Sequence, residues 1–154
     1  MKVITIFGQN VRRAREKKKM TIQKLSDISG YNRYDLSTLE NGEHDVLLST
    51  AISLAKALDE DFPLMLSRNY DAESGRYFID NDYLAIFCEN VHYKLNNKNM
   101  YQYALSSTTG IDSGNLSRIM KKEVTPKLGT LERIAGALKT DMDVLFTRRG
   151  GEAE

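Results

Sequence analysis

The stretch TIQKLSDISGYNRYDLSTLE, residues 21–40, decides the fold of this chain. Leu25 and Ile28 would supply the buried side of a first short helix. Gly30 ends that helix at a place where a left-handed residue is wanted. Asn32 is a good N-cap for a second short helix, which begins after only three or four residues. Two short helices joined by a tight turn that contains glycine are typical of a helix-turn-helix unit.

The chain carries this pattern twice. Residues 7–66 align with residues 87–146 at a constant offset of 80 and without a gap, and 17 of the 60 positions are identical. Ordinary composition would give roughly 4 identities by chance. Gly110 stands where the first copy has Gly30. The period is too long for a solenoid, so the sequence predicts two copies of one small domain.

Apolar residues at helical spacing surround both helix pairs. The first copy opens on the stripe Ile4, Phe7, Val11 and Ala14, and the second on Leu84, Phe87, Val91 and Leu95. Each copy then closes with a further helix and a last short helical turn. We expect an all-α protein with two tandem domains of about five helices each, at residues 1–68 and 84–148.

The segment between the two copies, residues 69–83, is acidic and contains several apolar side chains. A flexible linker would be polar or rich in Gly and Ser. We therefore expect this connector to pack across both domains; a dimer surface, or a short strand pair around residues 74–75, would also use its apolar groups. Residues 149–154 are predicted to be a flexible tail.

Composition narrows the function. The 22 Lys and Arg residues nearly balance 21 Asp and Glu residues, so the net charge by itself does not indicate a protein that binds nucleic acid. No apolar run reaches the roughly 18 residues of a membrane span, and no signal peptide is evident at the start. The single cysteine, Cys88, excludes an intramolecular disulfide and suits a reducing cytoplasm. We expect a cytoplasmic protein.

Catalytic and metal sites are not indicated. The chain has two histidines, His44 and His92, and no pair of His or Cys residues has metal-ligand spacing. A Gly-rich phosphate loop ending in Lys-Ser or Lys-Thr is absent. We expect no enzyme activity, no cofactor, no metal and no small-molecule ligand.

Both copies resemble the lambda repressor and Cro type of helix-turn-helix domain, also called the xenobiotic-response-element type. The first copy has the helix start Thr21 and the ending Glu40-Asn41-Gly42, and the second has Gln102 and the loop proline Pro126. The departures are complementary: Ile22 replaces the usual glutamine, Tyr101 replaces threonine, and residues 120–122 read Met-Lys-Lys. The resemblance implies a prokaryotic or phage protein that binds double-stranded DNA.

In that family the second helix of the pair enters the major groove. Residues 32–41 and 112–121 are then the recognition helices. Arg33 would read guanine and Asn32 adenine, while Tyr34 either packs at the core edge or contacts a thymine methyl group. The base contacts implied by the resemblance are Asn32, Arg33, Tyr34, Ser37, Ser113, Asn115, Ser117 and Arg118. Glu40 is expected to pair with a basic neighbour inside its own domain.

Phosphate contacts set affinity and its salt dependence rather than sequence preference. The candidates in the first copy are Arg12, Arg13, Lys17, Lys18, Thr21, Gln23 and Asn41. Those in the second copy are Gln102, Lys121, Lys122 and Lys127.

The sequence therefore favours a sequence-specific transcriptional regulator, most simply a repressor, with two different reading heads in one chain. A homodimer or a partner protein remains possible. The alternative is a protein-interaction module that keeps the fold, such as an antitoxin or a modulator encoded by a phage or plasmid.

Overall fold

A computed structural model describes residues 2–149 of the chain. The described residues form two compact units, residues 2–80 together with Lys127–Gly129, and residues 81–126 together with 130–149. Helices supply all the regular secondary structure in residues 2–149, and no strand occurs among them. The prediction of an all-α protein with two tandem domains is confirmed.

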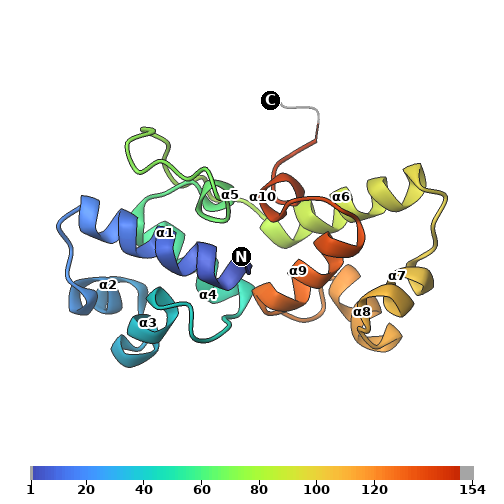
Figure 1. Ribbon diagram of the computed structural model, residues 1–154, viewed down its shortest axis with the longest axis horizontal. Helices are drawn as coiled ribbons and strands as arrows, with labels where there is room; N and C mark the ends of the chain where they lie inside the picture. Colours follow the sequence, from blue (N-terminus) through green and yellow to red (C-terminus); the bar gives the residue numbers. More distant parts are fainter. Residues whose placement is uncertain (1, 150–154) are drawn as a thin grey trace. The chain divides into compact units, whose positions relative to one another are not determined.

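The first unit contains five helices (Figure 1). They are α1 Val3–Lys17, α2 Ile22–Ser29, α3 Arg33–Glu40, α4 Leu48–Leu58 and α5 Phe62–Met65. Helices α2 and α3 are the predicted pair, and three residues from Gly30 to Asn32 separate them.

The five remaining helices repeat this order (Figure 1). They are α6 Tyr83–Asn97, α7 Gln102–Thr109, α8 Ser113–Met120, α9 Leu128–Ala137 and α10 Met142–Leu145. The starts of α7, α8, α9 and α10 lie 80 residues after those of α2, α3, α4 and α5. The sequence repeat is therefore a repeat of structure.

The turn inside each pair is built the same way. Gly30 and Gly110 adopt left-handed backbone, with φ of 78° and 76°, as expected for a residue that ends a helix. The Ser26 hydroxyl donates to the carbonyl of Tyr31 at 2.6 Å, and Ser106 makes the matching bond 80 residues later. Each serine thereby ties its helix to a residue of the turn that follows.

The core of each unit lies between the helix pair and the flanking helices. Leu25, Leu36 and their repeat partners Leu105 and Leu116 are fully buried. The prediction that Ile28 is buried was wrong: 49% of its surface is exposed. It lies near the C-terminal end of α2, an eight-residue helix whose one buried residue is Leu25.

One buried amide closes each unit. Asn10 Nδ2 on α1 donates to the carbonyls of Met65 and Ser67, at 3.0 and 2.9 Å. Asn90 Nδ2 on α6 donates to the carbonyls at positions 145 and 147, both at 2.8 Å. These carbonyls end α5 and α10, where a helix leaves its last acceptors unsatisfied. The conserved pairing joins the first helix of each unit to its last.

The first helix also touches the recognition helix. A Cβ atom on Gly8 would clash with the Leu39 carbonyl oxygen, so the backbones of α1 and α3 meet directly. In the second unit this place holds Cys88, whose Sγ lies 3.5 Å from the Ile119 carbonyl oxygen and donates to it. The cysteine is a packing residue at a helix crossing.

The connector packs on the first unit. Tyr70 is buried and donates its hydroxyl to Glu60 Oε1 at 2.9 Å. The Phe78 amide donates to Asp59 Oδ1 at 3.2 Å, so the segment stays attached to the loop between α4 and α5. The predicted strand pair around residues 74–75 does not form. The predicted tail lies outside the described residues, apart from Arg149.

Candidate nucleic-acid interface

Helix α3 presents three polar side chains at its N-terminal end. The Asn32 side-chain oxygen caps the helix by accepting from the amide of Asp35 at 3.0 Å, as predicted. Leu36 turns inward, which leaves Arg33 and Tyr34 exposed and Ser37 half-buried on the outer face. Tyr34 is 75% exposed, so packing at the core edge, one of its two expected roles, is wrong.

A shallow cavity brings residues of α2 and α3 together. Thr21 caps α2 by accepting from the Lys24 amide at 3.0 Å, and Gln23 donates to Asp27 at 2.8 Å. The cavity is lined by Arg15, Thr21, Ile22, Gln23, Arg33, Tyr34 and Ser37. Residues expected to touch phosphates and residues expected to touch bases thus share one surface.

The predicted cations on α1 all have partners within the unit. Arg12 Nε lies 3.3 Å from a carboxylate oxygen of Glu16, and both side chains are more than half exposed. Arg13 donates to Asn10 Oδ1 at 3.4 Å. An exposed ion pair such as Arg12–Glu16 is worth about 0–1 kcal/mol, so a phosphate could replace Glu16 as the partner of Arg12.

The lysines at the end of α1 pair with acidic groups from the chain that follows α4. Lys17 Nζ is 2.7 Å from Glu73 of the connector, and Lys18 Nζ is 3.5 Å from Glu60. Glu60 is buried, so Lys18 balances a charge that has little water around it. Lys18 therefore has a structural partner, a role that sequence reasoning missed.

A hydrogen-bond chain braces α3 from behind. Thr38 Oγ1 donates to the Asp35 carbonyl at 2.9 Å, so it accepts from His44 Nδ1. The other ring nitrogen of His44 then accepts from the Tyr31 hydroxyl at 3.0 Å. Burial raises the pKa of Tyr31, which keeps that hydroxyl protonated as a donor. The second copy has Ile111, Arg118 and Val124 at these places.

Helix α8 offers a different surface. Asp112 caps it by accepting from the Asn115 amide at 3.1 Å, as Asn32 caps α3. Ser113 and Arg118 are exposed, while Asn115 and Ser117 are half-buried. Small side chains therefore occupy the N-terminal end of this helix, and its cation lies one turn further along.

The remaining phosphate candidates lie at helix ends. Asn41 and Lys121 are exposed residues that follow α3 and α8, and Gln102 is the half-buried first residue of α7. Lys122 is exposed and has left-handed backbone, with φ of 62°, where the first copy has Gly42. Lys127 is exposed.

Comparison with known proteins identifies both units. Residues 90–148 match the model of a Cro/C1-type HTH DNA-binding domain, and residues 11–64 match a helix-turn-helix model. The chain is also 38% identical over 68 residues to the control protein C.SmaI of Serratia marcescens. The aligned stretch covers 44% of this chain and 81% of that protein. The chain belongs to the Cro/C1-type helix-turn-helix family. It is a DNA-binding transcription regulator. No solved structure matches it significantly.

Residues 2–149 contain no cluster of three His, Cys, Asp or Glu side chains that could hold a metal ion. Burial raises the pKa of Cys88 to about 11, which keeps the thiol protonated. No helix among the described residues is long and apolar enough to cross a membrane.

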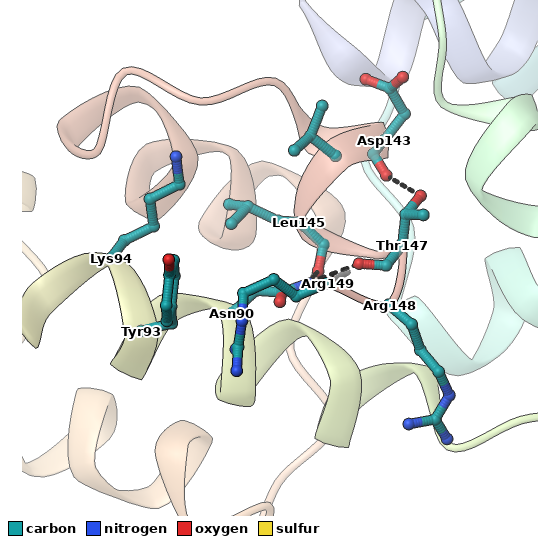
Figure 2. Close-up of a pocket in the computed structure, with 9 residues that line it drawn as sticks. Asn90, Tyr93, Lys94, Asp143, Leu145, Thr147, Arg148 and Arg149 are labelled. Atoms are coloured by element: carbon teal, nitrogen blue, oxygen red, sulfur yellow. Dashed lines mark hydrogen bonds between the residues drawn. The ribbon is translucent and has the colours of Figure 1, made fainter. Parts of the chain in front are cut away.

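The second Cro/C1-type domain also has a cavity that no residue of α8 lines (Figure 2). A cavity of about 300 Å³ opens between α6 and the segment around α10. Figure 2 shows Tyr93 and Lys94 of α6 on one side and Leu145 and Thr147 on the other. Arg149 covers the Tyr93 ring, with its guanidinium carbon 4.0 Å from the ring centroid. This surface was not found from the sequence, because its residues come from the two ends of the domain.

Proposed function

We propose that this protein binds double-stranded DNA sequence-specifically and acts as a transcriptional repressor, with α3 and α8 in the major groove. The observation that carries the proposal is the shared surface of α2 and α3. There Arg33 and Tyr34 project from the start of a recognition helix, beside Thr21 and Gln23 at the start of the preceding helix. In a helix-turn-helix, the start of the recognition helix reads base edges, and the start of the preceding helix contacts the phosphate backbone.

The two heads would read different sequences. Arg33 has the forked donors that suit guanine O6 and N7. Asn32 already uses its carbonyl oxygen as a cap, so its amide nitrogen is the group left to donate to a base. In α8, Arg118 supplies the matching fork from a later turn, behind Ser113, Asn115 and Ser117. A single chain would therefore prefer an asymmetric operator.

Repression follows from simple occupancy of the operator. The 148 described residues are accounted for by the two domains and the connector, and no sensor domain occurs among them. Binding would then respond to protein concentration or to a partner. The name of the similar control protein is consistent with a regulatory role.

The test is a selection of bound fragments from random duplex DNA, followed by affinity measurements over a salt series. Specific binding whose affinity falls steeply with salt supports the proposal. Arg33→Ala and Arg118→Ala should each relax base preference at a different part of the site, by about 1–3 kcal/mol. Absence of duplex binding at low salt would overturn the proposal. Repression itself is tested by transcription from a promoter that overlaps the selected site.

A second candidate role, as a module that binds another protein or a second copy of itself, rests on the cavity of the second domain. Val144, at its rim, is 51% exposed, and Tyr93 is 42% exposed. Size-exclusion chromatography with light scattering, on the wild type and on Val144→Lys, separates self-association from other partners. A monomer in both would remove the homodimer from consideration.

A further inference from the structure

Two large aromatic side chains project from the start of α7 in the second domain. Tyr101 and Tyr103 are 74% and 71% exposed, and their rings stack with centroids 6.3 Å apart and planes 14° from parallel. Neither hydroxyl has a hydrogen-bond partner among those that the structure records in residues 2–149. Burial of these rings by a partner would remove a large apolar area from water, and exposed patches of this kind mark interaction surfaces.

The first domain shows what this position normally does for the fold. Tyr101 replaces Thr21, whose hydroxyl caps α2 by accepting from the Lys24 amide. Tyr101 makes no side-chain cap, and α7 starts without one. Loss of a threonine cap costs about 1 kcal/mol of helix stability. The tyrosine is therefore unfavourable for the helix that carries it.

The neighbours of the tyrosines are small. In the first domain Thr21 and Gln23 line one surface with Arg33, Tyr34 and Ser37. The repeat places Tyr101 and Tyr103 in the same relation to Ser113, Gly114 and Ser117. In the helix pair of the first domain the exposed aromatic residue, Tyr34, belongs to the recognition helix, whereas in the pair of the second domain Tyr101 and Tyr103 belong to the start of the helix before it. The large side chains of the second domain therefore lie at the positions expected to face the DNA backbone, whereas in the first domain Tyr34 lies at a position expected to face the bases.

The surrounding charge suits a polyanion. From residue 98 to residue 122 the charged residues are four cations and one carboxylate, which gives a net charge of +3. The cations are Lys98, Arg118, Lys121 and Lys122, and all four are exposed. A phenol hydroxyl is a good donor to a phosphate oxygen, and tyrosine is among the side chains that contact DNA backbone.

We propose that Tyr101 and Tyr103 donate hydrogen bonds to backbone phosphates of duplex DNA, as a stacked pair in which each ring holds the other in place. This inference rests on the proposed function, and it adds two backbone contacts to the base contacts proposed for the second domain. Because the donors are uncharged, they add affinity without releasing counterions.

The experiment measures affinity of the full chain for its selected duplex over a salt series, with the double variant Tyr101→Phe and Tyr103→Phe. Phenylalanine keeps the stacked rings and removes only the hydroxyl groups. Hydrogen bonds to charged groups are among the stronger ones, so loss of both should weaken binding by about 100-fold or more at every salt concentration. The slope of log affinity against log salt should not change.

Two controls separate the possible outcomes. Lys121→Ala should reduce the salt slope by about 1, as expected for a phosphate contact by a cation. Tyr77→Phe alters an exposed tyrosine of the connector and should leave binding unchanged. Wild-type affinity in the double variant would overturn the inference while the proposed function stands. A wild-type chain that binds no duplex at low salt would overturn both.

Discussion

Arg15 and Glu40 form a bidentate ion pair between α1 and the last residue of α3. Arg15 Nε donates to Glu40 Oε2 at 2.7 Å, and Arg15 Nη2 donates to Oε1 at 2.9 Å. The two side chains are 12% and 4% exposed. This pair confirms the expectation that Glu40 pairs with a basic neighbour inside its own domain. The second domain has Leu95 and Met120 at the same positions, and both are buried.

The two domains thus contain a natural double replacement of a buried ion pair. We predict that Glu40→Met alone destabilises the first domain by about 3 kcal/mol, because it leaves the Arg15 charge without its partner. Arg15→Leu together with Glu40→Met should restore stability to within about 1 kcal/mol, because apolar replacement of both partners is often neutral. Urea denaturation of the four proteins in the cycle measures this. A double variant as unstable as Glu40→Met would show that the pair is not replaceable here.

The paired amides Asn10 and Asn90 should each stabilise their own domain. Alanine at either position leaves two carbonyls at the end of the last helix without a donor. We predict a loss of about 2 kcal/mol for each variant, since an unsatisfied buried acceptor costs roughly 1–3 kcal/mol. Hydrogen exchange localises the effect, which should be confined to the first domain for Asn10→Ala and to the second for Asn90→Ala. Equal loss of protection in both domains would contradict this assignment.

Cys88 should be inert in the native protein. Burial, the largest influence on it, raises the thiol pKa to about 11, so little thiolate exists at pH 8. We predict alkylation by iodoacetamide at least about 100-fold slower than in the urea-unfolded chain, where the thiol pKa is about 8.5. Rapid labelling without denaturant would show that the α6–α8 crossing opens readily.

The same shift predicts how stability varies with pH. The folded thiol has a pKa above that of the unfolded thiol, so its contribution is fully present below about pH 8.5 and is lost as pH rises towards 11. The wild type should therefore lose more stability than Cys88→Ala between pH 8 and pH 10. Thermal unfolding at the two pH values checks this difference. Parallel losses in the two proteins would contradict it.

Lys122 occupies a backbone position that favours glycine, and the first domain has Gly42 there. Left-handed backbone costs an ordinary residue about 1–2 kcal/mol, part of which glycine returns as extra freedom in the unfolded chain. We predict that Lys122→Gly raises the stability of the second domain by roughly 0.5 kcal/mol and weakens DNA binding with a smaller salt slope. Its ion pair with Asp82 is long, at 4.0 Å, and contributes little. Unchanged DNA affinity would remove Lys122 from the phosphate contacts.

Local chemistry explains why so much of the scaffold was predictable. Gly30 and Asn32 act through their own backbone and the three residues that follow, and the structure confirms both roles. In the second copy Gly110 ends α7 and Asp112 caps α8 in the same way. The DNA contacts of the candidate site residues stay predictions. What the structure adds is that Arg33, Tyr34 and Ser37 share a surface with Thr21 and Gln23.

Signals that depend on distant neighbours were missed. No local pattern around Lys18 indicates its ion pair with Glu60, and none around Tyr31 indicates its hydrogen bond with His44. The exposure of Tyr101 and Tyr103 was also hidden, because a tyrosine pattern alone does not tell a core position from a surface one.

The sequence by itself determined the helices, their turns and the doubling of the domain, because caps, glycines and apolar spacing act over a few residues. Only the tertiary structure decided which polar groups are used up inside each domain and which stay exposed. Arg15 looks like one cation among several in a basic run, yet it is bound to Glu40, which lies 25 residues away. Burial and pairing of this kind depend on how helices cross, and a crossing is fixed by the side chains of both helices together.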